Sequence, residues 1–309
     1  MFPIKLERAT ERQTLSAETG TGPKRGKDSA LIASQQPLQE SHTSMDSVTD
    51  PAESGDKAAL TKPEQADLPP QGSLETSRGA HLAAICFAMV LPTLATLLYF
   101  VFLSGSDLMK IVYFGSKVVQ FSFPLFWVLA VQRHRIRISR PTWKSIYAGI
   151  LMGIAIVGTG LLAYYGFLKD STYLENAPAL VTAKVAEMGL TSPTIYILFA
   201  LFLAVPHSLL EEYYWRWFVF GQTKRITGAN LAIIISSLGF MSHHVIVIHQ
   251  FLDNGWGVTL FFSLCVATGG VLWAWLYDRS KTLYGPWVSH LLVDLGIMYI
   301  GYDLATFAN

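Results

Sequence analysis

The stretch MGLTSPTIYILFALFLAVPHSLLEEYYWR, residues 188–216, has no Asp, Glu, Lys or Arg between Met188 and Leu210 and then reaches Glu211 and Glu212. A helix that crosses the hydrocarbon core of a bilayer needs about 20 mostly apolar residues. The run therefore predicts a membrane-spanning helix that ends on an acidic pair. Because charged groups are costly inside a membrane, ionisable residues at such places are candidates for a functional site.

Six further segments have a similar length and composition. The seven candidate spans are Gly79–Ser106, Ile111–Val131, Ser145–Leu168, Met188–Leu210, Ile226–Leu252, Asn254–Tyr277 and Thr282–Tyr302. Residues 173–190 are expected to form a short amphipathic helix at the interface, or part of an eighth buried element. The second span contains Lys117 near one end, where the side chain can snorkel toward water. The predicted fold class is all-α, a multi-pass transmembrane helix bundle with seven or eight spans.

The N-terminal quarter of the chain has a different composition. Phe2 is the only aromatic residue among residues 1–80, which also hold half of the 14 prolines. Such a segment buries too little apolar surface to offset the entropy of ordering it. We expect a disordered polar tail over residues 1–78 and a transmembrane domain over residues 79–305, with a motif-bearing core at about residues 190–305.

Loop charges predict the orientation of these spans. The loop Gln132–Lys144 has five Lys and Arg residues and no acid, and two later loops carry basic pairs, at residues 224–225 and at Arg279 and Lys281. Positively charged loops stay in the cytoplasm. Seven alternating spans place these three loops on one side, so we expect them and the N-terminal tail to be cytoplasmic.

Composition also excludes several classes of protein. A net charge of +1 lacks the basic footprint of a nucleic-acid-binding protein. The two cysteines, Cys86 and Cys265, lie within apolar runs and cannot form a disulfide scaffold, a CxxC redox pair or a Cys-rich zinc site. No cleavable signal peptide or C-terminal lipidation signal is visible. We expect an integral membrane protein that has the lipid bilayer as a partner and does not bind nucleic acid.

The first polar cluster lies at the end of the fourth span. Glu212 and Arg216 are four residues apart and share a helix face, so they can form an ion pair. Glu211 lies about 100° around the helix from Glu212 and can point into the bundle. Pro206 removes a backbone hydrogen bond and is expected to kink this helix just before Glu211.

Two more clusters follow within the fifth and seventh spans. Phe240 precedes His244 by four residues, with His243 beside it, and His290 precedes Asp294 by four. A pair at this spacing shares a helix face, so His290 and Asp294 can form one carboxylate–imidazole unit. Each histidine needs a polar partner at such a depth.

Together, Glu211, His244 and His290 carry groups suited to activating a water molecule. A carboxylate that is shielded from bulk water can act as a general base. One imidazole can hold the water or a proton, and a second can stabilise a developing oxyanion. The residues therefore predict hydrolysis of an amide bond within or beside the bilayer.

The motifs EExxxR, FxxxH and HxxxN/D lie in this order on successive membrane helices. This pattern resembles that of the CAAX-protease and bacteriocin-processing family, which includes the type II CAAX prenyl endopeptidases. The resemblance covers roughly residues 190–305 and implies a glutamate-dependent intramembrane protease that needs no cofactor. It assigns Glu211 as the base and His244 as its partner on the water, with His290 and Asp294 on the oxyanion side and Glu212, Arg216 and Phe240 in supporting positions.

The third motif departs from the family pattern in one respect. An Asn at position 294 would donate a hydrogen bond directly, whereas ionised Asp294 cannot donate. Asp294 must therefore orient His290 or be protonated. The doublet of His243 and His244 leaves a second ambiguity, in which the spacing from Phe240 favours His244.

Three alternatives stay open. Glu211, His244 and His290 are all possible zinc ligands, although the sequence contains no HExxH motif. Intramembrane Glu, His and Asp also build proton relays in transporters. A non-catalytic immunity or scaffold protein on the same fold is the third.

The simplest interpretation of His207, His243 and His249 is structural, with His207 as a further supporting candidate because it precedes Glu211 by four residues.

The expected partner is a membrane-associated protein or peptide substrate. The eukaryotic branch of the resembled family removes the last three residues of prenylated CAAX proteins. The sequence does not distinguish a prenylated protein from another peptide, and it does not indicate an oligomeric state.

Overall fold

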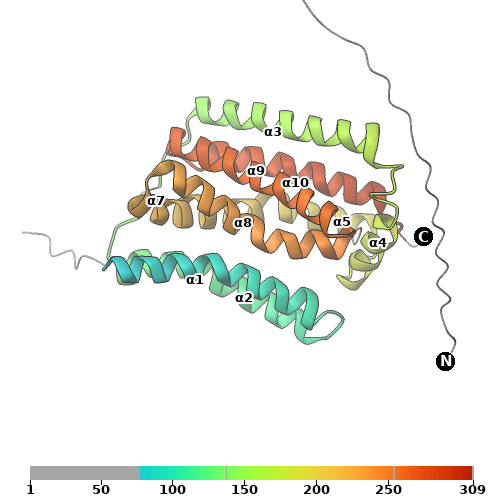
Figure 1. Ribbon diagram of the computed structural model, residues 1–309, viewed down its shortest axis with the longest axis horizontal. Coiled ribbons are helices and arrows are strands. Elements are labelled where there is room, and N and C mark those ends of the chain that lie inside the picture. The colour runs from blue at the N-terminus through green and yellow to red at the C-terminus, as the bar shows by residue number, and fades with distance from the viewer. Residues whose placement is uncertain (1–76, 137, 253–254, 308–309) are drawn as a thin grey trace, which may run out of the picture. The chain divides into compact units, whose positions relative to one another are not determined.

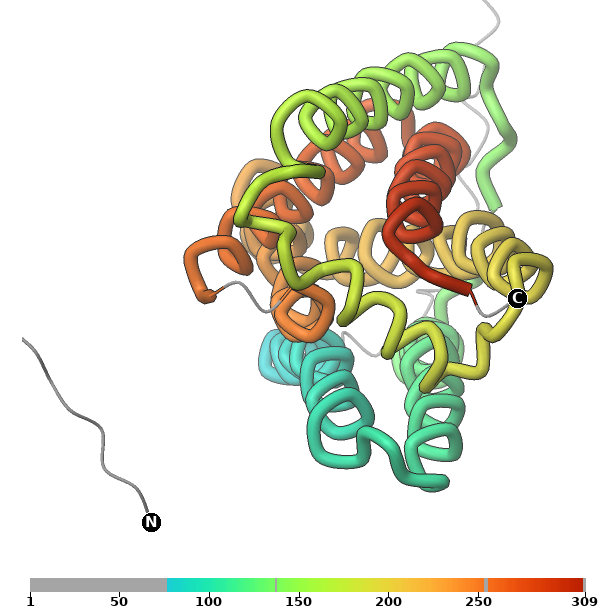
Figure 2. Tube along the Cα trace, turned by 90° about the vertical axis from the view of Figure 1, so that its right-hand side faces the viewer, coloured from blue at the N-terminus to red at the C-terminus, as the bar shows by residue number. Residues whose placement is uncertain are grey.

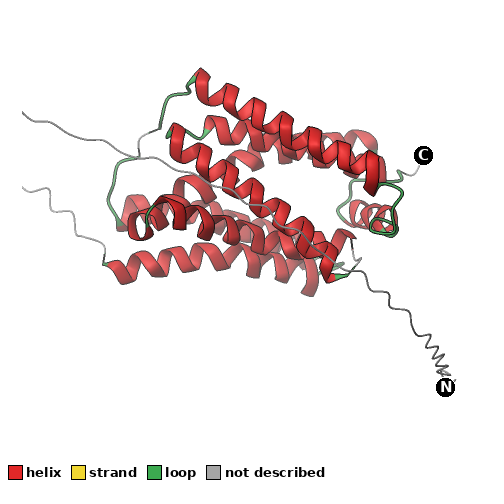
Figure 3. Cartoon of the chain, turned by 45° about the horizontal axis from the view of Figure 1, so that its top comes forward, coloured by secondary structure: helices red, strands yellow, loops and turns green. Residues whose placement is uncertain are grey.

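The computed structural model describes residues 77–136, 138–252 and 255–307, and every regular element in these ranges is helical (Figure 3). The α-helices are α1 (Arg78–Leu97), α2 (Leu108–Phe126), α3 (Trp143–Ala163), α4 (Ala177–Glu187), α5 (Pro193–Phe202), α6 (Ser208–Glu212), α7 (Gly221–Thr227), α8 (Ala229–Leu252), α9 (Trp256–Ser280) and α10 (Tyr284–Leu304). The π-helical segments are η1 (Leu98–Phe102), η2 (Trp127–Val131), η3 (Tyr164–Leu168), η4 (Leu203–His207) and η5 (Tyr213–Phe220). The all-α prediction is confirmed. The predicted tail, except for its last two residues, lies outside the described ranges.

Six helices in the described part of the chain are long and apolar enough to cross a membrane. They are Arg78–Phe102, Leu108–Val131, Trp143–Leu168, Pro193–Thr227, Ala229–Leu252 and Trp256–Ser280. The seventh predicted span is present as the 21-residue helix α10, but its His290, Asp294 and Asp303 lower its apolar character. The predicted count of seven or eight spans is therefore not confirmed. Residues 173–190 contain the short helix α4, as expected.

The fourth predicted span differs from its prediction in extent. It begins at Pro193 and continues to Thr227 as one helix of 35 residues, assembled from α5, η4, α6, η5 and α7. Glu211 and Glu212 consequently lie near the middle of a helix rather than at its end. The helix continues because Glu212 pairs with Arg216, which removes the cost of two unpaired charges.

The helices pack in an order that brings the motif-bearing segments to the centre. In Figure 1, α1 and α2 lie together on one side, α3 lies on the other, and α8, α9 and α10 lie between them. Figure 2 shows the same arrangement from the end of the helices, with α3 beside α10. The core of this packing is aromatic and is formed largely by η5, with Tyr214, Trp215 and Phe218 buried against Phe240 and Trp273.

Close contact between α3 and α10 depends on small residues. A Cβ atom added to Gly149 would lie 2.1 Å from the carbonyl oxygen of Gly285, and one added to Gly153 would lie 2.8 Å from the side chain of Leu292. Small residues allow membrane helices to approach in this way. The Gly149-x-x-x-Gly153 pattern therefore holds α10, with His290, against α3.

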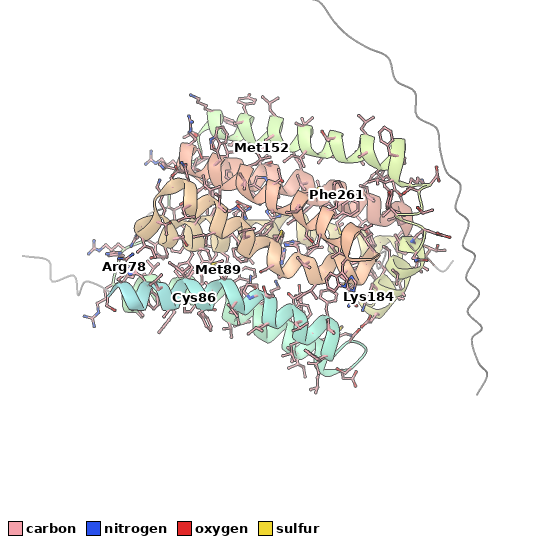
Figure 4. All side chains as sticks on the ribbon, in the orientation of Figure 1. Arg78, Cys86, Met89, Met152, Lys184 and Phe261 are labelled. Carbon is pink, nitrogen blue, oxygen red and sulfur yellow. The ribbon has the colours of Figure 1, made fainter. Side chains whose placement is uncertain are left out.

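Contacts between loops agree with the predicted alternation of the helices. The Ser139 hydroxyl donates to the Lys281 carbonyl at 2.9 Å, and Asp278 forms ion pairs with both Lys224 and Lys281. All three basic loops thus share one end of the bundle. Figure 4 shows Arg78 at this end and Lys184 near the opposite one.

The outer surface of the bundle is apolar. Large side chains such as Phe114, Leu151 and Leu198 are each more than 60% exposed, at 66%, 69% and 62%. An apolar exterior of this extent is stable only in contact with lipid. Cys86 and Cys265 are both free, in agreement with the absence of a disulfide scaffold.

Candidate active site

Two π-helical segments flank the helical turn that carries the acidic pair. Segment η4 contains Pro206 and precedes α6, and η5 follows α6 directly. Within η4, the Val205 carbonyl accepts a hydrogen bond from Nε1 of Trp287 on α10 at 3.0 Å. The distortion predicted from Pro206 thus takes the form of a π-helical turn, a feature that is frequent at functional sites. The hydrogen bond from Trp287 to Val205 connects this part of the fourth span to the helix that carries His290.

Glu212 is completely buried, and one of its two carboxylate oxygens, Oε1, carries its contacts while Oε2 has no hydrogen-bond partner among the described residues. Its Oε1 lies 3.1 Å from Nη1 of Arg216 and accepts a hydrogen bond from Nδ1 of His290 at 2.8 Å. The Arg216 guanidinium also lies 4.7 Å from the ring centre of Phe240 and 5.1 Å from that of Trp273. The predicted pairing of Glu212 with Arg216 is therefore present, and it is joined by a histidine that was expected elsewhere.

His290 is held by a stacked ring and by a hydrogen bond at one ring nitrogen. Its ring stacks on Trp273 with a centroid separation of 4.1 Å. Because its Nδ1 bonds to a carboxylate, that nitrogen carries a proton, and Nε2 is directed to the other side of the ring. Nε2 lies 3.5 Å from Oδ1 of Asp294 and 3.7 Å from Oε2 of Glu211. His290 thus bridges the two members of the acidic pair.

Glu211 has a different environment from that of Glu212. Three imidazoles surround its carboxylate, with Nε2 of His207 at 4.0 Å, Nε2 of His243 at 3.8 Å and Nε2 of His290 at 3.7 Å. Each separation is longer than a hydrogen bond. The side chain is nevertheless almost completely buried, at 4% exposure for the residue. The arrangement leaves the carboxylate beside three polar nitrogens without a direct bond to any of them.

Comparison with protein families places these contacts in a known context. Residues 193–296 match the family model described as Type II CAAX prenyl endopeptidase Rce1-like. We call residues 193–296 the Rce1-like domain, after the family model that they match. The match contains every motif residue from Glu211 to Asp294, so the predicted family resemblance is confirmed. The match supports the activity of a CAAX-type membrane endopeptidase, whose substrate is a membrane-associated protein. No curated protein and no solved structure matches the chain.

The Rce1-like domain brings most of the predicted site residues together, with His244 slightly apart. The His244 Nδ1 bonds to the Phe240 carbonyl at 2.8 Å, and since a carbonyl only accepts, this nitrogen is protonated and Nε2 carries a lone pair. Its ring lies 4.2 Å from that of His243. Among the described residues, no ion pair joins His244 to a carboxylate.

His243 is the site neighbour that the sequence analysis had interpreted as structural. It is 5% exposed and stacks on Trp215, and its Nδ1 has no hydrogen-bond partner among the described residues. Adjacent helical residues lie about 100° apart, so only one member of the doublet can face Glu211 directly. The signal available in the sequence was the doublet itself, but the family spacing from Phe240 selected His244.

Within the described ranges, no three His, Cys, Asp or Glu side chains of the Rce1-like domain are arranged as a metal-binding group. The ligand set considered from the sequence, Glu211, His244 and His290, includes one imidazole whose Nδ1 is engaged with a backbone carbonyl. What the geometry does offer is a buried carboxylate with several proton-accepting or proton-donating nitrogens around it, a combination suited to acid–base chemistry.

Proposed function

We propose that this chain is a membrane-embedded endopeptidase that hydrolyses a peptide bond with a water molecule activated by Glu211. One observation carries the proposal: a buried carboxylate lies 3.7–4.0 Å from three imidazole nitrogens within an Rce1-like domain. Gaps of this size are too long for direct hydrogen bonds and are bridged well by a water molecule.

Glu211 acts as the general base in this scheme. It takes a proton from the water as the water oxygen bonds to the scissile carbonyl carbon, and the carbonyl oxygen becomes an oxyanion. When the tetrahedral intermediate collapses, the C–N bond breaks and protonated Glu211 returns the proton to the leaving amine. The Glu211 carboxylate is thereby restored, and the products are a new amine and a new carboxylic acid, which still carries the second water proton and ionises on release.

His290 is the group we assign to the oxyanion side. Its Nδ1–H donates to Glu212 at 2.8 Å, which fixes the orientation of the ring. When Nε2 is also protonated, it can donate to the oxyanion. Asp294, with Oδ1 at 3.5 Å from Nε2, supports this protonated form, which is the orienting role that an aspartate allows where an asparagine would donate.

His244 is assigned to holding the water together with Glu211. The bond from Nδ1–H to the Phe240 carbonyl supports this role, because it leaves Nε2 as an acceptor for a water proton. Arg216 and Phe240 support the site from behind, the first by neutralising Glu212 and the second by packing on Arg216. No metal is required by this scheme, and zinc bound by Glu211, His244 and His290 is the alternative that the experiment addresses.

The substrate proposed is a membrane-associated protein or peptide, with prenylated C-terminal sequences as the class that the family description suggests. From the charges of the loops we also propose that the tail is cytoplasmic and that substrates reach the site from that side.

The test is cleavage of a panel of membrane-associated peptides, with and without a prenyl group, by the purified full chain in lipid nanodiscs. Wild type is compared with Glu211→Gln and His244→Ala, each with and without a chelator. Glu187→Gln is the matched control, because it removes a carboxylate outside the Rce1-like domain.

We expect cleavage by the wild type and by Glu187→Gln, a loss of cleavage in the other two variants, and no effect of the chelator. Chelator-sensitive cleavage that zinc restores would replace the metal-free mechanism. Cleavage unchanged by Glu211→Gln would exclude the proposed base. If no form cleaves, proton flux into liposomes that depends on Glu211 would favour the transporter, and its absence would favour the immunity or scaffold protein.

A further inference from the structure

Lys117 lies in the interior of a membrane-spanning helix. The helix begins at Leu108 rather than at the predicted Ile111, and it continues to Val131 as α2 and η2. With a rise of 1.5 Å per residue, Lys117 is about 14 Å from the start of the helix. This position differs from the predicted one near the helix end, where snorkelling would have sufficed. A cation at such depth is costly and usually has a partner.

The side chain of Lys117 has no carboxylate partner within 4.0 Å in the described part of the chain. Its Nζ lies 5.9 Å from the ring centre of Tyr113 and 5.7 Å from that of Phe121, and it donates a hydrogen bond to Oε1 of Gln120 at 3.3 Å. Aromatic rings and one amide oxygen stabilise an ammonium group, but they leave its charge uncompensated.

Gln120 adds a second unused donor beside Lys117. Its side chain is 2% exposed, and Nε2 has no hydrogen-bond partner among the described residues. A buried amide N–H without an acceptor is uncommon in proteins. Lys117 and Gln120 together therefore present an ammonium without a counter-charge and an amide donor without an acceptor, which is a combination complementary to a carboxylate.

A chain of contacts connects these donors to the proposed catalytic carboxylate. The Phe121 ring that Lys117 contacts lies 6.3 Å from the ring of His207, and Nε2 of His207 lies 4.0 Å from Glu211. These steps bound the separation of Nζ and the Glu211 carboxylate at roughly 17 Å, which about five extended residues span.

We propose that Lys117, positioned by Gln120, receives the C-terminal carboxylate of the substrate and so directs cleavage to a bond within a few residues of the chain end. This inference rests on the proposed endopeptidase function. A peptide with neutral side chains near its C-terminus has one anion there, and the Lys117 ammonium supplies the matching charge. A protein segment that continues beyond the site would leave Lys117 uncompensated, so internal bonds are selected against.

The competing explanation is that Lys117 only balances the charge of Glu211. The two explanations differ in what they predict for the substrate. Charge balance affects all peptides equally, whereas a carboxylate receptor affects only those with a free C-terminus. A comparison of a free acid with its C-terminal amide therefore separates them.

The experiment measures binding and cleavage of one probe, a fluorescent peptide with an S-farnesyl cysteine fourth from its end, as the free acid and as the amide. The full chain is used in zwitterionic nanodiscs, with binding measured in the Glu211→Gln background to prevent turnover. Lys117→Met removes the charge, Lys117→Arg keeps it, and Lys110→Met is the control, because Lys110 is an exposed lysine on the same helix. Thermal unfolding verifies that each variant is folded.

We expect the acid to bind about tenfold to a hundredfold more tightly than the amide, in keeping with a charge-assisted hydrogen bond. Lys117→Met should reduce this ratio to near one, while Lys117→Arg and Lys110→Met should largely keep it. Equal binding of acid and amide by the Lys117 form, or a ratio that survives Lys117→Met, would overturn the inference. A binding ratio that depends on Lys117, without cleavage of either peptide, would support Lys117 as the carboxylate receptor and overturn the proposed protease. Equal cleavage of the acid and the amide would support the protease and overturn the proposed role of Lys117.

Discussion

Glu211 and Glu212 are neighbours on one helical turn, yet their surroundings are opposite. Glu212 has a guanidinium at 3.1 Å and an imidazole N–H at 2.8 Å, so its charge is compensated within the protein. Glu211 has three imidazoles that stay at 3.7 Å or farther. Both side chains are buried, and the 100° turn between them separates a carboxylate with short contacts from one that we propose as the general base.

The contrast shows how one helix can bury two adjacent acids in a membrane. A buried charge with short hydrogen bonds contributes to a stable, fixed structure, and removal of its partner is strongly destabilising. A buried charge without short bonds keeps its lone pairs available for a proton. His290 lies within 4.0 Å of both acids, so it connects Glu212 to the proposed general base Glu211.

The largest expected effect is on catalysis, from Glu211→Gln. The change keeps the shape of the side chain but removes its ability to take a proton, so cleavage should fall by about 10²–10⁴-fold. Thermal unfolding should be unchanged or slightly improved, since no short bond is lost and a buried charge is removed. The measurement is the initial rate of peptide cleavage beside a melting curve. A variant that unfolds at a clearly lower temperature would show that Glu211 is structural after all.

The next effect is on stability, from Glu212→Met. Arg216 and the Nδ1–H of His290 would lose their acceptor, and an uncompensated buried charge costs about 3–5 kcal/mol. The double variant Glu212→Met/Arg216→Met should recover much of this loss, because both charges are gone. Unfolding free energies of the two single variants and the double variant form the measurement. A double variant that is no more stable than Glu212→Met would argue against the pair.

Changes in the histidine doublet sharpen the comparison further. His244→Ala removes the proposed water ligand and should lower the rate about a hundredfold, while His243→Ala removes a neighbour of Glu211 and should lower it about tenfold. His249→Ala is the control on the same helix, since His249 stacks on Trp256 instead. Cleavage rates at fixed substrate give the result. A greater loss in His243→Ala would exchange the two assignments.

The smallest expected effect is at Glu187, a carboxylate at the end of the bundle. A hydrogen bond from Lys184 holds the pKa of the Glu187 carboxyl below its usual value, with help from Ser104 and the Gly105 N–H. Because the folded pKa is lowered, this pairing stabilises the protein above about pH 4.3 and is lost as the pH falls through the folded pKa. Glu187→Gln should cost less than about 1 kcal/mol near pH 7.

Melting curves of the wild type and Glu187→Gln from pH 7 to pH 3 test this expectation. The difference between them should shrink toward the acid end of the range. A difference as large as that of Glu212→Met would mean that burial is not what separates the two carboxylates.

Apolar runs were sufficient to predict the helices, because a bilayer imposes a length and a composition on each span. They placed every predicted span on an observed helix, including α10. They failed at the end of the fourth span, since Glu211 was taken as the point where the helix leaves the membrane. The spacing predicted the pairing of Glu212 with Arg216, but it did not reveal that the pair is buried inside the helix bundle, with Arg216 against the rings of Phe240 and Trp273.

The motifs predicted most residues of the candidate site, but not which histidine of the doublet lies beside Glu211. Motif spacing identified Glu211, His290 and Asp294, which the structure brings within 4 Å of one another through His290. It did not identify His243, because the direction of a side chain depends on the π-helical turns and on how α8 rotates against the fourth span. π-Helical turns have no simple signature in the amino-acid sequence.

The 35-residue helix Pro193–Thr227 has a mechanical consequence. At 1.5 Å per residue it is about 50 Å long, well beyond a hydrocarbon core of about 30 Å. It must tilt or project from the bilayer, and the tilt changes with membrane thickness. Since Glu211 lies near its middle, hydrophobic mismatch sets the depth of this carboxylate in the bilayer. The proposed peptidase activity should therefore vary with the acyl-chain length of the surrounding lipid.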